Sequence, residues 1–196
     1  MLTKIVGSLD TARKDVERLI RDVYFNHYGA WIPTFPTRMA AAFGRDDRPV
    51  CAAGLRDAHS GFFSETYLDQ PVEQSISAAV GMSVDRRKVV EVTTLASLQP
   101  GASLMLLDFM MQDSLARNMQ WGLFTATRSL RQLLRRVGAE VIELAPANPA
   151  RIGNALMWGS YYETDPVVCV IAGQPASVMP RQKPRLISQG PQLADV

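Results

Sequence analysis

The chain has 196 residues, of which 47% are hydrophobic and 20% are charged, and its formal net charge is +2. This length and composition predict one folded domain with a sizeable core and exclude a disordered chain. The near balance of 21 Lys and Arg against 19 Asp and Glu gives no argument for nucleic-acid binding.

The first half of the chain predicts a helix, a strand and a mixed segment. The helix begins at Asp10 or Thr11, either of which can cap it, and ends at Gly29. Its inward face is formed by apolar residues at helical spacing: Val16, Leu19, Ile20, Val23 and Tyr24. Two prolines in 30–44 predict a loop with at most a short helix, and "PVCAAGLRDA" predicts a strand. Residues 61–81 are ambiguous, with a short helix expected after Pro71.

The second half alternates strands and helices. Strands are predicted over 88–97, 121–127, 139–147 and 166–173, and a loop with one helical turn over 148–165. Helices are predicted over 103–120 and 129–138. The first of these helices has an expected inward stripe of Leu104, Leu107, Met111 and Leu115. Alternation with short connections predicts an α/β fold, in which one mixed central sheet carries helices on both faces.

The domain is predicted to span 1–173. Four prolines among polar residues in 174–196 predict a mobile C-terminal tail. The N-terminus lacks the apolar core of a secretory signal, and no apolar run is long enough to span a membrane, so a cytoplasmic protein is expected. Cys51 and Cys169 lie in apolar runs and are expected to be buried free thiols. With two histidines and no CxxC, a metal site is not expected.

Glu91 interrupts an otherwise apolar strand, "VEVTTLAS". A buried unpaired charge costs several kcal/mol, so this carboxylate needs a partner or a chemical role. One interpretation is an ion pair with Arg56 on a neighbouring strand. The other is a general base near the end of a central strand, and the sequence leaves both open.

Several polar and aromatic residues are candidates for the same cleft. The turn "LQPGAS" leads into a helix, and a helix N-terminus can bind phosphate. Thr125 and Thr127 stand where a strand ends, although Thr127 or, preferably, Ser129 can instead cap the next helix. The aromatic loop "WGSYYETD" can pack as a lid or supply a phenol. His27 is interpreted as a helix cap or a base, and Glu65 with Glu73 as surface charges or an amine-binding pair.

Five motifs together resemble the thermostable hemolysin family: "VYFNHYGA", "FFSETYLDQPVE", "VEVTTLAS", "WGLFTAT" and "WGSYYETDP". The likeness extends over about residues 12 to 173. The order of elements resembles the GNAT acyltransferases and, within that fold, the acyl-homoserine-lactone synthases. The resemblance implies a single GNAT-like domain. It also implies an N-acyltransferase that moves an acyl group from acyl-CoA or acyl carrier protein to an amine or amino-acid acceptor.

The resemblance also implies roles for individual residues. Glu91 would be the general base, and Tyr161 or Tyr162 would protonate the leaving thiolate. The donor-binding residues would be Thr94, Leu95, Ala96, Ser97, Gly101, Ala102 and Ser103. The acceptor-binding residues would be Thr93, Thr125, Thr127, Glu65, His27 and Trp158.

No cofactor would be tightly bound, because the acyl-CoA or phosphopantetheine thioester is a co-substrate. This chain has Thr93 and Thr94 where the family has Gly-Asn, and its phosphate loop is reduced to "LQPGAS", which favours a carrier protein as donor. Two alternatives stay open: a membrane-active hemolysin-like protein, and a non-catalytic acyl- or lipid-binding GNAT-like domain. A homodimer is also left open.

Overall fold

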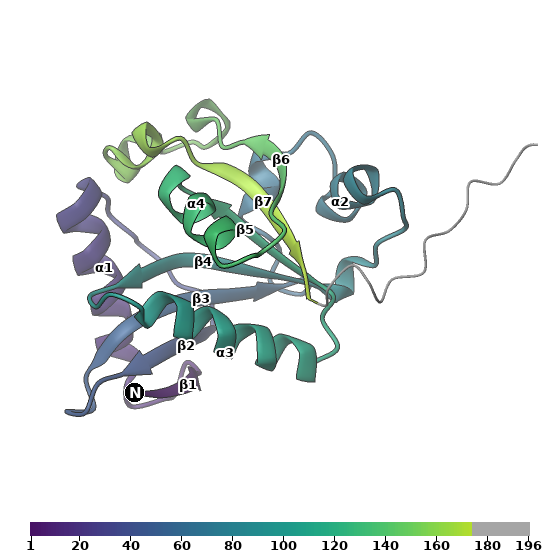
Figure 1. Cartoon of the computed structure of the whole chain (residues 1–196). Coiled ribbons are helices and arrows are strands. Elements are labelled where there is room, and N and C mark those ends of the chain that lie inside the picture. The colour runs from purple at the N-terminus through teal and green to yellow at the C-terminus, as the bar shows by residue number, and fades with distance from the viewer. Residues whose placement is uncertain (174–196) are drawn as a thin grey trace, which may run out of the picture.

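The computed structural model describes residues 1–173, which form one domain around a seven-stranded sheet (Figure 1). The strands lie in the order β1-β2-β3-β4-β5-β7-β6. Their bounds are β1 Leu2–Val6, β2 Arg38–Phe43, β3 Pro49–Asp57, β4 Val89–Ser97, β5 Trp121–Ala126, β6 Ile142–Pro146 and β7 Val167–Ala172. The β4–β5 pair is parallel and the other adjacent pairs are antiparallel. The predicted mixed sheet is therefore confirmed.

Helices cover both faces of this sheet, as predicted. The four helices are α1 Arg13–Tyr28, α2 Val72–Val80, α3 Ala102–Ala116 and α4 Arg128–Arg136. The pleat of β2 shows the two layers: Met39 and Ala41 pack with α1, whereas Ala40 and Ala42 pack with α3. Five short 3-10 turns complete the chain: η1 Ser64–Tyr67, η2 Arg86–Lys88, η3 Pro149–Arg151, η4 Ala155–Trp158 and η5 Tyr161–Thr164.

Three local predictions are corrected by the structure. Residues 38–43 form β2 rather than a short helix, because pairing with both β1 and β3 outweighs the helix propensity of alanine. Ala12 occupies the N-cap of α1, while the Asp10 carboxylate accepts the Ala12 N–H at 2.9 Å just before the helix. The buried stripe of α3 consists of Ala102, Leu106 and Met110, of which only Met110 was expected, as a residue that widens the stripe of Leu104, Leu107, Met111 and Leu115.

Strands β4 and β5 separate toward their carboxyl ends. Their pairing runs from Val89–Trp121 to Val92–Phe124, and β4 then continues alone on that side to Ser97. The register between β3 and β4 also shifts here, because Thr94 and Leu95 together lie opposite the single residue Ala53. This is a β-bulge, and it holds Thr94 at φ 48. The strand that carries Glu91 therefore leaves its neighbour just beyond that residue.

Gly54 allows a close approach beside this bulge. A Cβ atom at Gly54 would lie 2.5 Å from Thr93 Oγ1 and 2.7 Å from Pro36 Cγ. Only a residue without a side chain fits between them, so the loop before β2 packs directly onto β3 and β4. That packing positions one wall of the site.

Candidate active site

A cavity of about 940 Å³ opens where β4 and β5 separate. Its lining comes from both faces of the sheet. On the α1 face the lining is aromatic and includes Trp31, Phe63, Tyr67, Trp158 and Tyr161. On the other face α3 and α4 supply Leu104, Leu107, Met111, Leu130 and Leu133. Residues 93–95 and Thr125 lie between these two regions, so the cavity joins a polar centre to an apolar arm.

Glu91 lies at the polar centre with its side chain fully buried. Its two carboxylate oxygens accept the backbone N–H groups of Phe63 and Ser64, each at 2.7 Å. Burial raises the pKa of this carboxyl above its ordinary value, while the hydrogen bonds from Ser64 and Phe63 and the charge of Arg56 act in the opposite direction. A carboxyl with a raised pKa at a cavity wall is suited to accept a proton.

The predicted ion pair between Glu91 and Arg56 is not formed. The two residues are register partners on β4 and β3, yet the ion pairs found within residues 1–173 do not include them. The carboxylate is held by backbone donors instead. Of the two interpretations of Glu91, the structural ion pair is therefore excluded in this geometry.

A chain of hydrogen bonds connects the Glu91 loop to β5. Ser64, which donates its N–H to Glu91, shares a 2.8 Å hydrogen bond between its Oγ and Thr125 Oγ1. The Tyr161 hydroxyl donates to the Thr125 carbonyl oxygen at 3.4 Å. Burial raises the pKa of Tyr161 well above its ordinary value, so its phenol stays protonated at neutral pH. The structure thus brings together three of the predicted residues, Glu91, Thr125 and Tyr161, from distant parts of the chain.

Tyr162 points elsewhere. Its hydroxyl shares a 2.7 Å hydrogen bond with the hydroxyl of Tyr67, and Tyr67 lines the cavity whereas Tyr162 does not. Burial raises the pKa of Tyr67 and of Tyr162. Tyr161 is accordingly the better placed of the two predicted proton donors.

Trp158 and Tyr161 belong to one aromatic wall. Their ring centroids are 5.3 Å apart, and Trp158 stacks on Phe63 at 5.6 Å. Gly159 lies between them at φ 51, where a Cβ would meet the Tyr28 carbonyl oxygen at 1.9 Å. The close approach ties the β6–β7 connection to the end of α1 and fixes the wall.

His27 and Glu65 do not line the cavity. His27 is exposed on the last turn of α1, with its ring edge against Tyr28 at 4.8 Å. Glu65 binds the Arg86 guanidinium at 2.7 Å and accepts the Val72 N–H at 2.8 Å. Glu73 binds the same arginine at 2.9 Å, so this pair of carboxylates stabilises the start of α2.

The two threonines predicted after β5 both line the cavity, and one of them also caps a helix. Thr127 Oγ1 accepts the Leu130 N–H at 3.3 Å at the N-terminus of α4. The preference for Ser129 as the cap was wrong, because Ser129 already lies within the helix. Thr125 contributes both its hydroxyl and its carbonyl to the site.

The predicted donor residues divide between two adjoining hollows. Thr94 and Leu95 line the main cavity, as does Thr93, which was predicted to bind the acceptor. Ser97 and Gly101 line a second pocket of about 380 Å³ at the N-terminus of α3, and Ser103 lines both. Ala96 and Ala102 are buried and line neither. Gly101 has φ 80, a backbone conformation that favours glycine at this turn.

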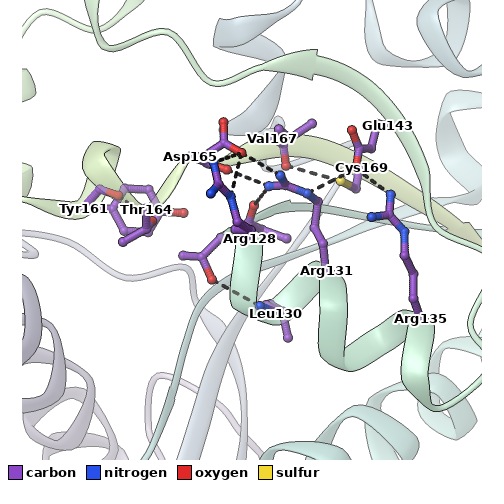
Figure 2. Close-up of polar contacts among 12 residues, drawn as sticks. Arg128, Leu130, Arg131, Arg135, Glu143, Tyr161, Thr164, Asp165, Val167 and Cys169 are labelled. Carbon is purple, nitrogen blue, oxygen red and sulfur yellow. Dashed lines mark hydrogen bonds and ion pairs between the residues drawn. The ribbon is translucent and has the colours of Figure 1, made fainter.

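A buried arginine fixes the far end of β5 (Figure 2). Arg131 is 6% exposed, and its guanidinium donates to the Ala126 carbonyl at 2.9 Å and to the Asp165 carbonyl at 2.6 Å. It also binds the Asp165 carboxylate at 2.9 Å, and this contact lowers the pKa of Asp165. Arg131 thereby connects α4, β5 and the start of β7. Sequence analysis missed it, because Leu130, Leu133, Leu134 and Val137 were expected to face inward; of these Val137 is exposed.

Sequence analysis also missed Ser64, Phe63 and Tyr67. Their segment carries no regular periodicity, and their roles depend on contacts with β4 and with the β6–β7 connection. The motif "FFSETY" was noted, but which of its atoms reach Glu91 follows only from the packing of η1. Within residues 1–173, no group of three or more metal-ligating side chains is found. No helix of that part of the chain is long and apolar enough to cross a membrane.

The fold is that of GNAT-like acyltransferases. The chain is similar to the AHL synthase LasI, with a TM-score of 0.60, 11% identity, and coverage of 88% of this chain and 90% of LasI. FeeM, an N-acyl amino acid synthase from uncultured soil microbes, gives a TM-score of 0.57, 12% identity, and coverage of 88% and 94%. TofI, solved with an inhibitor and MTA, gives a TM-score of 0.56 and 14% identity, with coverage of 88% of this chain and 92% of TofI.

Within this fold class the chain belongs to the thermostable hemolysin family, whose sequence profile matches residues 6–176. The family resemblance predicted from the motifs is confirmed. A search of curated protein sequences gives no match.

Proposed function

We propose that this protein is an N-acyltransferase that moves an acyl group from a thioester donor to the amine of a small acceptor. The observation that carries the proposal is the position of Glu91. A fully buried carboxyl with a raised pKa lines a cavity at the point where two parallel strands separate. Perturbed titratable groups in a cleft of this kind are typical of active sites.

The residues around the cavity supply each part of an acyl transfer. The amine nitrogen attacks the thioester carbonyl carbon, and Glu91 takes the proton from that nitrogen directly or through a water molecule. The carbon–sulfur bond then breaks, and the thiolate takes a proton from Tyr161. The products are an amide and a free thiol. Glu91 then loses its proton to solvent and Tyr161 takes one from solvent, so atoms and charges balance over the cycle.

The open edge of β4 supports the assignment of an oxyanion site near Thr94 and Leu95. Beyond Val92 this edge has no pairing with β5, so its backbone N–H groups are available to a ligand. An N–H group directed at the thioester oxygen would stabilise the negative charge that develops there. The same edge can pair with the amides of a phosphopantetheine arm, as an added strand would.

The apolar arm between α3 and α4 suits the acyl chain of the donor. Its leucines and methionine bound a cavity within the usual range of about 300–1,000 Å³ for ligand pockets. The second pocket, at the N-terminus of α3, suits a phosphate of the pantetheine arm. Its described lining carries no cationic side chain, which favours a carrier-protein phosphopantetheine over the more highly charged CoA.

The acceptor would lie on the α1 side, beside Thr93, Thr125 and Trp158. These line the cavity near Glu91, whereas His27 and Glu65 do not and are left out of the proposed site. The polar centre and apolar arm together favour acyl transfer over a lytic or a purely lipid-binding role. A domain of 1–173, a C-terminal tail and a cytoplasmic location remain predictions, and the tail lies outside the described residues.

The test is thiol release from octanoyl-CoA and from octanoyl-loaded acyl carrier protein, with and without a panel of amines. Release that depends on an amine, together with the matching amide by mass spectrometry, would support the proposal. Glu91→Gln should abolish most of this activity, whereas Glu140→Gln, at an exposed position, should not. Failure of the wild-type protein to transfer from either donor to any amine would refute it.

A further inference from the structure

Arg56 is the only cationic side chain among the described residues that line the main cavity. Glu91 and Asp108 are the other charged residues of that lining, and Asp108 is exposed on α3. The remaining lining is apolar, aromatic or neutral and polar. One positive charge therefore stands at the polar end of a mostly apolar cavity.

This guanidinium has no carboxylate partner within residues 1–173. Its one side-chain hydrogen bond, to the Ser60 carbonyl oxygen, is long at 3.4 Å. Other arginines of the described residues that are buried or partly buried do have carboxylate partners, for example Arg38 with Asp113, Arg86 with Glu65, and Arg131 with Asp165. A guanidinium carries five N–H donors in a planar fork, so Arg56 keeps most of its donor capacity for a ligand.

The position of Arg56 relative to Glu91 indicates where the charged groups of that ligand would lie. The two residues are paired in register on adjacent strands, so their side chains leave the same face of the sheet. The Glu91 oxygens bind the N–H groups of Phe63 and Ser64 rather than Arg56. A negative and a positive group thus stand side by side without neutralising each other.

We propose that Arg56 binds the carboxylate of an amino-acid acceptor whose amine is presented to Glu91. The inference rests on the proposed function and narrows the acceptor from any amine to one that also carries a carboxylate. A guanidinium and a carboxylate form two parallel charge-assisted hydrogen bonds, which fix orientation as well as position. The aromatic wall of Phe63, Trp158 and Tyr161 suits an acceptor with an apolar side chain.

Matched pairs of ligands test this inference. L-phenylalanine and phenethylamine, L-tyrosine and tyramine, and L-leucine and 3-methylbutylamine each differ only by the carboxylate. We expect calorimetry to show that wild-type protein binds at least one amino acid about 10- to 100-fold more tightly than its amine, the range for hydrogen bonds to a charged group. Equal affinity within every pair would overturn the inference.

Arg56→Gln should remove this preference while leaving the affinity for the amine within about threefold, since the amine makes no contact with Arg56. Arg56→Lys keeps the charge without the fork and should restore part of the preference. Arg48→Gln, at an exposed turn, is the matched control. Thermal melts show that each variant is folded. A preference that survives in Arg56→Gln would also overturn the inference.

Thiol release measured on the same ligands separates the inference from the proposed function. Transfer to the amines as efficient as transfer to the amino acids would leave the proposed function standing and overturn the role of Arg56. A carboxylate preference in binding that Arg56→Gln abolishes, without transfer to any acceptor, would support the role of Arg56 and refute the acyltransferase.

Discussion

Ser64 donates its backbone N–H to Glu91 at 2.7 Å, and its hydroxyl shares a hydrogen bond with Thr125 on the neighbouring strand. The loop before α2 therefore bridges the two strands at the point where they begin to separate. Glu91 is held in place by backbone donors on this loop and not by an opposite charge. A carboxylate without a charged partner can change protonation state during a reaction without breaking an ion pair.

Glu91→Gln is expected to reduce the rate of acyl transfer about a hundredfold or more, because the side chain loses its basicity. It should also lower the free energy of unfolding by about 1–3 kcal/mol, since an amide has one acceptor oxygen for two backbone N–H donors. Thermal melts and single-turnover thiol release on the same variant measure both. Full activity with reduced stability would mean that Glu91 serves the fold alone.

The pH dependence of the reaction should follow the raised pKa of Glu91. A base works only when deprotonated, so the rate should rise with pH through a midpoint above the ordinary glutamate value. Arg56 acts to lower this pKa, and Arg56→Gln should therefore move the midpoint to higher pH. Rate–pH profiles of both proteins provide the measurement, and a midpoint that stays fixed in the variant would contradict the expected coupling.

The same pKa has a consequence for stability. The folded protein holds the Glu91 proton more tightly than the unfolded chain does, so protonation of Glu91 contributes to the free energy of unfolding. This contribution is fully present below the unfolded-state pKa and is lost as pH rises through the folded-state pKa. Glu91→Gln removes that dependence. Denaturant unfolding of both proteins at several pH values above the ordinary glutamate pKa should therefore show a loss of stability with pH that is steeper in the wild type.

Thr94→Val is expected to stabilise the protein by about 1 kcal/mol. The Thr94 hydroxyl is buried and has no hydrogen-bond partner within the described residues, so replacing it with a methyl group removes a desolvation cost. Valine keeps the β-branched shape, so the strain at φ 48 stays the same. The melting temperature should rise by about 2–4 °C.

Thr127→Val is the matched control for that substitution. It removes the same hydroxyl from a residue that caps α4, and should destabilise the protein by about 0.5–2 kcal/mol. In thermal melts the melting temperature should therefore rise for Thr94→Val and fall for Thr127→Val. A loss of stability at Thr94 similar to that at Thr127 would show that the Thr94 hydroxyl has a partner in solution.

Arg131→Met should destabilise the protein by about 3–5 kcal/mol, the range for breaking a buried charged contact by removing one partner. It leaves the carbonyls of Ala126 and Asp165 without their donor. Arg135→Met, one turn further along α4, breaks only an exposed pair with Glu143 and should cost less than about 1 kcal/mol (Figure 2). Chemical denaturation compares the two, and equal losses would rule out Arg131 as the residue that holds β5 and β7 together.

The sequence by itself determined the alternation of strands and helices in the second half of the chain and the burial of Glu91. The pattern of Val and Thr around Glu91 identifies a strand, and leucine spacing identifies α4, because side-chain periodicity depends only on backbone geometry. The ends of α1 and α4 were also predictable, since Gly29 and Gly138 adopt the left-handed conformation that favours glycine. Family motifs then pointed to the correct fold class.

Only the tertiary structure decided which of these residues meet. Arg56 and Glu91 are neighbours that do not pair, while Ser64, Thr125 and Tyr161 come together from three separate segments. The bulge at Thr94, which leaves no periodic signal, contributes to the cavity together with the separation of β4 from β5. The physical reason is that local periodicity indicates only which side chains are buried. Contacts between residues more than 20 positions apart in the sequence depend on how the sheet and helices pack against one another.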